Sequence, residues 1–331
     1  NAETGNILTR VGNPLSITSG DGGPATEARI IDPQGITFAP TGNLIIGEAG
    51  GQVIRRVQND TITTIVGTGS AQFGGDNGPA ANANLNRPLG VATDPQGNLY
   101  IADSFNRRIR KVDTNGNMTT FAGFGSPDSD GFSGDGGPAN TARLSRVSAV
   151  ATDSLGRVFL ADTQNHRVRL IDTNGIITTI AGTGNQGFSG DGGPGNQADL
   201  DSPQGLAIDS QGNLFISDTG NHRVRLLNLT TLLIQTVAGT GNGQLDLEDG
   251  GALAVSLNNP QGLAISPTGT VLIADRSNHR VRELSIQFDL PNLFTPPEKS
   301  ADFNADGQLD FSDFLLFINA FGNTDAQFDL N

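Results

Sequence analysis

Short apolar runs alternate with polar segments rich in Asn, Asp and Gly along most of the chain. In one representative stretch, polar turns separate apolar runs that begin at Gly205, Asn213, His222 and Leu233. Short apolar runs bounded by turn residues are typical of antiparallel β-strands. The pattern therefore predicts four consecutive strands in this stretch.

The same pattern recurs in five units. Segments such as LGRVFLADTQNHRVRLI from Leu155 and QGNLFISDTGNHRVRLL from Gln211 agree in spacing and in residue type. The shared glycines are 55 to 59 residues apart, at Gly42, Gly97, Gly156, Gly212 and Gly269. Four-stranded repeats arranged radially make a β-propeller. We therefore predict an all-β fold, a five-bladed β-propeller of four-stranded blades.

The fifth unit has no fourth strand after its third strand, which we place at Arg280 to Leu284. At the other end of the sequence, GNILTRVG from Gly5 aligns with the fourth strand GIITTIAG from Gly175. Pairing these two ends would cover a sheet edge that is otherwise open. We therefore predict that Ile7 to Val11, the N-terminal strand, completes the fifth blade and closes the propeller.

A second repeated signature connects the units. It reads SGDGGPA or a close variant and begins at Ser19, Gly74, Ser133, Ser189 and, in degenerate form, Leu247. Gly and Pro at fixed positions predict ordered connections. A Phe precedes the Asp of three of these loops, at Phe73, Phe132 and Phe188. These rings are either core residues under the loops or an exposed ring of contacts.

The D-x-x-N-H-R-V-R pattern is carried by Asp162 to Arg169, Asp218 to Arg225 and Asp275 to Arg282, and it resembles the NHL repeat. The resemblance covers residues 5 to 285. Blade one departs from it, because Glu48 replaces the Asp and Gly51-Gln52 replaces Asn-His. NHL propellers often have six blades, so the count of five rests on the repeats. The resemblance also implies an alternative function, since some NHL-like propellers are lyases or hydrolases with a central metal.

The tail carries a different signal. Side-chain oxygens occupy positions one, three, five, nine and twelve of an EF-hand-type calcium loop, with Gly307 at six and Gln308 at seven. The predicted ligands are Asp302, Asn304, Asp306, Gln308, Asp310 and Asp313. A loop followed by an apolar helical run, with no helix before it, resembles the dockerin repeat. Calcium is therefore the expected cofactor, and the alternative is an Asp-rich linker that binds nothing.

These signals divide the chain into three regions. Residues 1-288 are the NHL-type β-propeller, 289-300 are a Pro-rich linker, and 301-331 are the dockerin-like calcium-binding repeat. Phe328 to Asn331 looks like the opening of a second, incomplete loop. We expect the natural chain to continue beyond it.

Composition narrows the partners. The net charge is −14, which disfavours binding to nucleic acid, and the absence of Cys excludes disulfides, thiolate metal sites and cysteine nucleophiles. The apolar stretch Phe314 to Ile318 is too short to span a bilayer. The chain begins with Asn1 rather than Met, which suits an exported chain without its signal, or a fragment. We expect an extracellular or cell-surface location, in a bacterium.

The repeated polar residues have simpler roles than catalysis. The three histidines, His166, His222 and His279, occupy one slot of successive blades, which separates them too far to share an ion. The Asp before each turn is expected to cap it, and the second motif Arg to pair with an acid of a neighbouring blade. Three N-x-S/T sequons, near the turns between third and fourth strands, are candidate glycosylation sites: Asn59, Asn117 and Asn228.

We therefore predict a non-catalytic, secreted or cell-surface interaction and assembly module. A rigid propeller would present loops, and the calcium-stabilised tail would dock to a protein partner or join copies into an extracellular fibre or layer. The alternative is an NHL-type lyase or hydrolase with a central metal. One Tyr and no Trp argue against a carbohydrate or other small-molecule substrate.

Overall fold

The computed structural model describes residues 9–12, 18–125, 131–244, 250–266 and 268–285. The chain divides into two compact units, Asn1–Ser285 and Ile286–Asn331. The predicted linker and calcium-binding repeat lie in the second unit, outside the described residues, so the fold below is that of the first unit.

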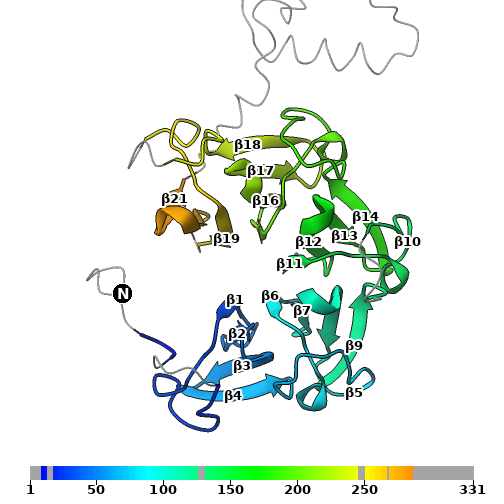
Figure 1. Ribbon diagram of the computed structural model, residues 1–331, viewed down its shortest axis with the longest axis vertical. Coiled ribbons are helices and arrows are strands. Elements are labelled where there is room, and N and C mark those ends of the chain that lie inside the picture. Colours follow the sequence, from blue (N-terminus) through cyan, green and yellow to red (C-terminus); the bar gives the residue numbers. More distant parts are fainter. Residues whose placement is uncertain (1–8, 13–17, 126–130, 245–249, 267, 286–331) are drawn as a thin grey trace, which may run out of the picture. The chain divides into compact units, whose positions relative to one another are not determined.

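Five antiparallel sheets stand around a common centre, with the first strand of each sheet innermost (Figure 1). Blade one contains β1 (Pro33–Phe38), β2 (Leu44–Glu48), β3 (Val53–Gln58) and β4 (Thr61–Val66). Blade two contains β6 (Pro88–Thr93), β7 (Leu99–Asp103), β8 (Arg108–Val112) and β9 (Asn117–Ala122). Blade three contains β11 (Val147–Thr152), β12 (Val158–Asp162), β13 (Arg167–Ile171) and β14 (Ile176–Ala181).

Blade four contains β15 (Gly205–Ile208), β16 (Asn213–Asp218), β17 (Arg223–Asn228) and β18 (Ile234–Ala238). Blade five contains β19 (Pro260–Ile265), β20 (Val271–Asp275) and β21 (Arg280–Leu284). Two short strands from the connecting loops, β5 (Gly78–Pro79) and β10 (Gly137–Pro138), pair with the outer strands β9 and β14. The predicted all-β, five-bladed propeller is confirmed, and four of its blades have the expected four strands.

Helices among the described residues are confined to single turns. Between the second and third strands lie η2 (Ser104–Asn106), η4 (Thr163–Asn165), η6 (Thr219–Asn221) and η7 (Arg276–Asn278). The connecting loops contain η1 (Ala80–Asn82), η3 (Ala139–Thr141) and η5 (Gly195–Gln197). No helix in the described ranges is long and apolar enough to cross a bilayer.

The core lies between neighbouring blades rather than at one centre. One cluster, for example, joins Ile109 of β8 to Val150 of β11 and Leu160 of β12. Inner strands approach so closely that glycine is required. A Cβ on Gly205 would lie 1.8 Å from the carbonyl oxygen of Gln261 in the next blade. Close approach likewise explains the glycines of the first strands of blades one and two, Gly35 and Gly90.

The predicted closing strand is only partly described. Ile7 and Leu8 lie outside the described residues, while Thr9, Arg10 and Val11 are described and belong to no strand. The sheet of blade five therefore shows three strands, β19-β20-β21. Closure of the propeller by the N-terminal strand stays a prediction.

Candidate interaction surface

A buried Arg organises each of the first four blades. Arg169 on β13 is fully buried, and it lies 3.4 Å from the carboxylate of Asp162 and 2.7 Å from that of Asp135. The pairing of β13 with β14 shifts register between Val168 and Arg169, and such a bulge re-aims a side chain. The same arrangement surrounds Arg55, Arg110 and Arg225.

The expected pairing of this Arg with a neighbouring blade was wrong. Asp162 belongs to the turn of the same blade, and Asp135 belongs to the loop that precedes it. That loop runs along the outer edge of its own blade, where Gly137 pairs with Ile177 of β14. The loop therefore brings its acid to the Arg of the blade that it introduces.

The turn carboxylates are enclosed by partners. Asp162 accepts hydrogen bonds from the Ser145 amide and the Asn165 side chain, as well as from Arg169. Burial raises the pKa of Asp162, although these three partners act in the opposite direction. Burial likewise raises the pKa of Asp218 to about 6. The expected capping of the turn backbone was wrong, because Asp162 and Asp218 accept from the Asn side chain of the turn and not from its backbone amides. Both carboxylates are buried and face no open site.

The residue in the His slot joins blades one, three and four to the blade that follows each of them. His166 has a left-handed backbone, with φ of 52°, and its Nδ1 accepts a hydrogen bond from the Ser202 amide of blade four. His222 accepts from Asn259 in the same way. In blade one the side-chain oxygen of Gln52 takes this place and accepts from Arg87. His166 and His222 are therefore separate contacts between blades.

The recurring loop Phe stacks against arginine side chains. The guanidinium of Arg108 lies 3.7 Å from the Phe73 ring centroid, and that of Arg110 lies 4.9 Å from it. Phe132 and Phe188 each stack with two Arg in the same manner. Phe73 and Phe188 stay partly exposed, so these rings are not core residues under the loops.

The centre of the propeller offers little reactive chemistry. A cavity of about 420 Å³ is lined there by residues of all five inner strands, including Gln34, Gln204 and Gln261. The other lining residues are glycine, serine and apolar side chains, and none is ionisable. The described part of the chain has no group of three or more His, Cys, Asp or Glu that could hold a metal ion.

The remaining predicted site residues fall in two places. Asp302, Asn304, Asp306, Gln308, Asp310 and Asp313 lie outside the described residues. The three sequons lie where expected, beside the turns between third and fourth strands. Asn59 and Asn117 are exposed, whereas Asn228 accepts hydrogen bonds from two backbone amides and donates one to Asn213.

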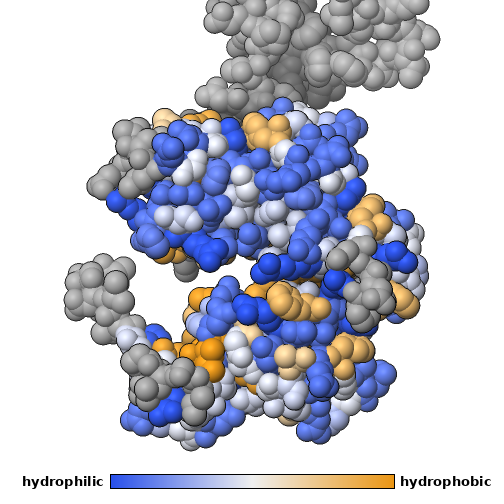
Figure 2. All heavy atoms as spheres, viewed as in Figure 1, coloured by the Kyte–Doolittle hydropathy of each residue, from blue (hydrophilic) through white to orange (hydrophobic). Residues whose placement is uncertain are grey.

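Two apolar surfaces are exposed, one on blade one and one on blade five. They are the sides of these two blades that would meet if the ring of blades were closed. We call Ile36 and Phe38 the blade-one end face, and Leu272 and Val281 the blade-five end face. Ile36 is 69% exposed and Val281 is 72% exposed. The residues equivalent to Ile36 in blades two to four, Val91, Val150 and Leu206, are at most 8% exposed. Figure 2 shows the hollow between the two ends of the ring, with apolar side chains beside it.

In a closed ring, the five inner strands would form five pairs of neighbours. The described inner strands form four such contacts. β1 contacts β6, β6 contacts β11, β11 contacts β15, and β15 contacts β19. No comparable contact joins β19 to β1, although both strands are fully described. A Cβ added to Gly262 of β19 would meet only the Ala274 side chain of its own blade.

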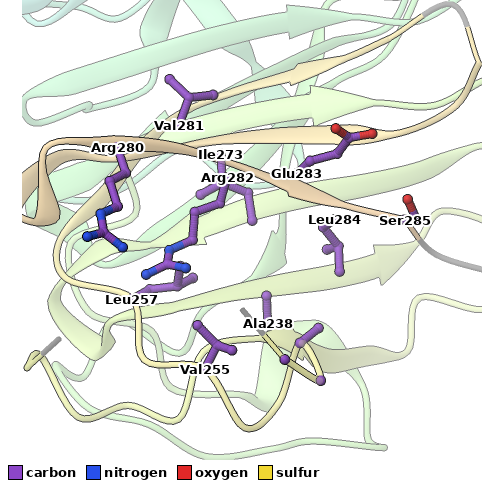
Figure 3. A pocket seen from close by; sticks show the side chains of 13 residues that line it. Ala238, Val255, Leu257, Ile273, Arg280, Val281, Arg282, Glu283, Leu284 and Ser285 are labelled. Carbon is purple, nitrogen blue, oxygen red and sulfur yellow. The ribbon is translucent and has the colours of Figure 1, made fainter. Parts of the chain in front are cut away.

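A groove runs along the edge of β21 that pairs with no strand among the described residues. Its volume is about 850 Å³, and Ala252, Val255, Leu257 and Leu284 supply apolar walls. Figure 3 shows Leu284, Leu257 and Val255 on one side of β21, with Val281 on the other side. The groove and the two end faces are the candidate interaction surface, and sequence reasoning did not predict that Ile36 and Val281 are exposed. The missing fourth strand of blade five was its only signal in the sequence.

Known proteins share the repeat. The NHL repeat model matches residues 200–225 and 257–284, and the Teneurin NHL domain model matches residues 69–129 and 117–189. The chain is 30% identical to mouse Teneurin-1 over 233 residues, which is 63% of this chain and 8% of the mouse protein. It is 25% identical to Arabidopsis thaliana protein SUPPRESSOR OF QUENCHING 1, chloroplastic, covering 80% of this chain and 26% of that protein.

A solved structure shares the fold. An auxiliary nutrient binding protein from Bacteroides ovatus superposes with a TM-score of 0.56 at 17% identity, covering 81% of this chain and 60% of that one. At this identity the likeness shows the fold alone. The chain thus carries NHL repeats on a five-bladed β-propeller, and it spans only a small part of the length of these sequence relatives.

Proposed function

We propose that this chain is a non-catalytic interaction and assembly module that acts outside the cell or at the cell surface. The exposed end faces carry the proposal, because the residues equivalent to Ile36 and Val281 are buried at the joints between blades one to four and are open to solvent at the two ends. Exposed apolar patches on a soluble domain mark surfaces that bind another protein. Its similarity to NHL-repeat proteins and teneurin NHL domains supports a propeller interaction module.

Self-association can be measured directly. We expect the particle mass from light scattering to rise with concentration, and electron microscopy to show linear or layered arrays. Val281→Asp would place a charge on the blade-five end face and should lower the mass. Leu155→Asp is the matched control, since Leu155 is 68% exposed but lies outside both end faces. A constant monomer mass for the unaltered chain would contradict assembly.

The tail supplies a second part of the proposal. We propose that Asp302, Asn304, Asp306, Gln308, Asp310 and Asp313 bind calcium, since this ligand spacing suits its oxygen preference. Titration calorimetry of the full chain with Ca²⁺ should give one saturable binding event. Asp302→Ala with Asp306→Ala should abolish it. Asp172→Ala should retain it, because Asp172 only accepts turn hydrogen bonds in the propeller.

The alternative lyase or hydrolase would need a metal at the propeller centre. The lining there presents amides and apolar side chains rather than ionisable ligands. Anomalous scattering from crystals of the full chain would decide this point. A metal ion at the centre would overturn the non-catalytic proposal.

A further inference from the structure

The same contacts recur at the formed joints between neighbouring blades. They therefore show which contacts are missing at the two ends of the ring. At each formed joint, a third-strand residue is buried against the next blade, as Val168 and Val224 are. The backbone amide that follows the fourth strand donates to a carbonyl in the loop of the next blade. This bond joins Gly67 to Ala80, Gly123 to Ala139, Gly182 to Gly195 and Gly239 to Ala252.

The same bond is already present on blade one. The Gly12 amide donates to the carbonyl of Ala25 over 3.0 Å, and Val11 packs against the cluster of Ala25, Ala28 and Ile62. Gly12 therefore stands where a fourth strand of a preceding blade would end. Blade five is the only described blade without a fourth strand.

The groove along β21 matches the side chains that this strand would bring. In blade three, Ile177 of β14 is fully buried in a cluster with Ala139, Ala142, Leu144 and Ile171. The equivalent residues in blade five are Ala252, Val255, Leu257 and Leu284, and all four line the groove. Ile7 is the residue equivalent to Ile177 in the alignment that ends at Gly12. The groove lining therefore matches the surroundings of Ile177, the residue equivalent to Ile7.

Within one chain, the two halves of this joint stay apart. Thr9 and Arg10 are exposed, and Ile180, the residue equivalent to Arg10, is only 6% exposed in blade three. The end faces that would meet on closure are exposed by 69% at Ile36 and 72% at Val281. A second copy can cover each exposed end face, because each chain carries both a blade-one end face and a blade-five end face.

We propose that the β21 edge is a strand-acceptor site, and that its occupant is the segment Ile7 to Val11 of a second copy of this chain. The blade-one end face of the donor would then cover the blade-five end face of the acceptor. This interface joins two different surfaces, so repetition gives a ring if the rotation between copies closes and an open-ended array if it does not. The inference rests on the proposed assembly function and specifies its contact.

Register predicts which residues become neighbours. In blade three, Leu170 pairs with Thr178 and Ile171 pairs with Ile177. The equivalent pairs across the proposed contact are Glu283 with Leu8 and Leu284 with Ile7. The chain has no Cys, so Leu8→Cys and Glu283→Cys introduce one thiol each. The two variants can be given different tags, mixed in equal amounts, and oxidised mildly.

Strand donation predicts a disulfide between the two different chains, seen as a mixed dimer on a non-reducing gel. Leu170→Cys replaces Glu283→Cys in the matched control, because Leu170 holds the same position on a strand that β14 already covers. This control should give at least tenfold less mixed dimer. The double variant carrying both cysteines should form a ladder of oligomers.

Other outcomes separate the inference from the proposed function. If the double variant closes within one monomer at every concentration, each chain completes its own ring and strand donation is refuted. If arrays form but no mixed disulfide appears, strand donation is refuted while the assembly function stands. Adding Val281→Asp to the Glu283→Cys chain should reduce the mixed dimer, whereas adding Leu155→Asp should not. Equal melting temperatures would show that these variants remain folded.

Discussion

Replacing Arg169 with Met should destabilise the propeller strongly. The guanidinium is fully buried and lies 3.4 Å from Asp162, whose side chain is also fully buried. Removing one partner of a buried ion pair leaves an uncompensated charge and costs about 3–5 kcal/mol. Asp135, the second partner, is 37% exposed, so water can replace the Arg there and its loss adds about 0–1 kcal/mol. We therefore expect Arg169→Met to lower the free energy of unfolding by about 3–6 kcal/mol.

Urea unfolding followed by far-ultraviolet circular dichroism suits this chain, which has no Trp and one Tyr. Arg143→Met is the control, because Arg143 is exposed, and it should change the unfolding free energy by less than about 0.5 kcal/mol. Combining Arg169→Met with Asp162→Asn removes the unpaired carboxylate charge. It should restore about 0.5–3 kcal/mol of the lost free energy of unfolding. A loss below about 1 kcal/mol for Arg169→Met alone would refute the role given to the buried pair.

Three further predictions concern single residues. His166→Gln should keep the acceptor for the Ser202 amide, as Gln52 does in blade one, while His166→Ala should lose about 1 kcal/mol in urea unfolding; equal losses would contradict this role. In a secretory host that glycosylates, mass spectrometry should find glycans at the exposed Asn59 and Asn117 and none at Asn228, whose side chain is engaged; a glycan at Asn228 would count against it. Burial raises the pKa of Asp218 from 3.8 to about 6. Between these pH values the folded protein therefore binds more protons than the unfolded chain. The stabilisation from protonated Asp218 at low pH is lost as the pH rises through 6. Asp218→Asn should therefore weaken the fall in unfolding midpoint between pH 4 and 7, and an unchanged pH dependence would oppose the assignment.

Sequence reasoning found the strands because their signals are local. The turn after β16 has a left-handed residue at His222, and the sequence Asp-Thr-Gly-Asn-His marks it without reference to other blades. The count of five blades followed from the repeats. Both features depend on backbone preferences that each segment carries in itself.

Long-range features were harder to predict. The acid that pairs with Arg169 comes from a loop 34 residues earlier, because a bulge turns the side chain toward that loop. Whether the end faces meet depends on how side chains set the angle at every joint, and no single segment encodes that angle. Counting strands therefore identified the open edge of β21 but not the exposure of Ile36 and Val281.

The most direct test of assembly through the open ends is an electron cryomicroscopy reconstruction of the assembled particle, with the chain traced continuously through Gly12. We predict a fourth strand along β21 that belongs to a neighbouring copy, with its Ile7 side chain beside Leu284. A fourth strand traced to the same chain, or a β21 edge left open in the particle, would contradict it.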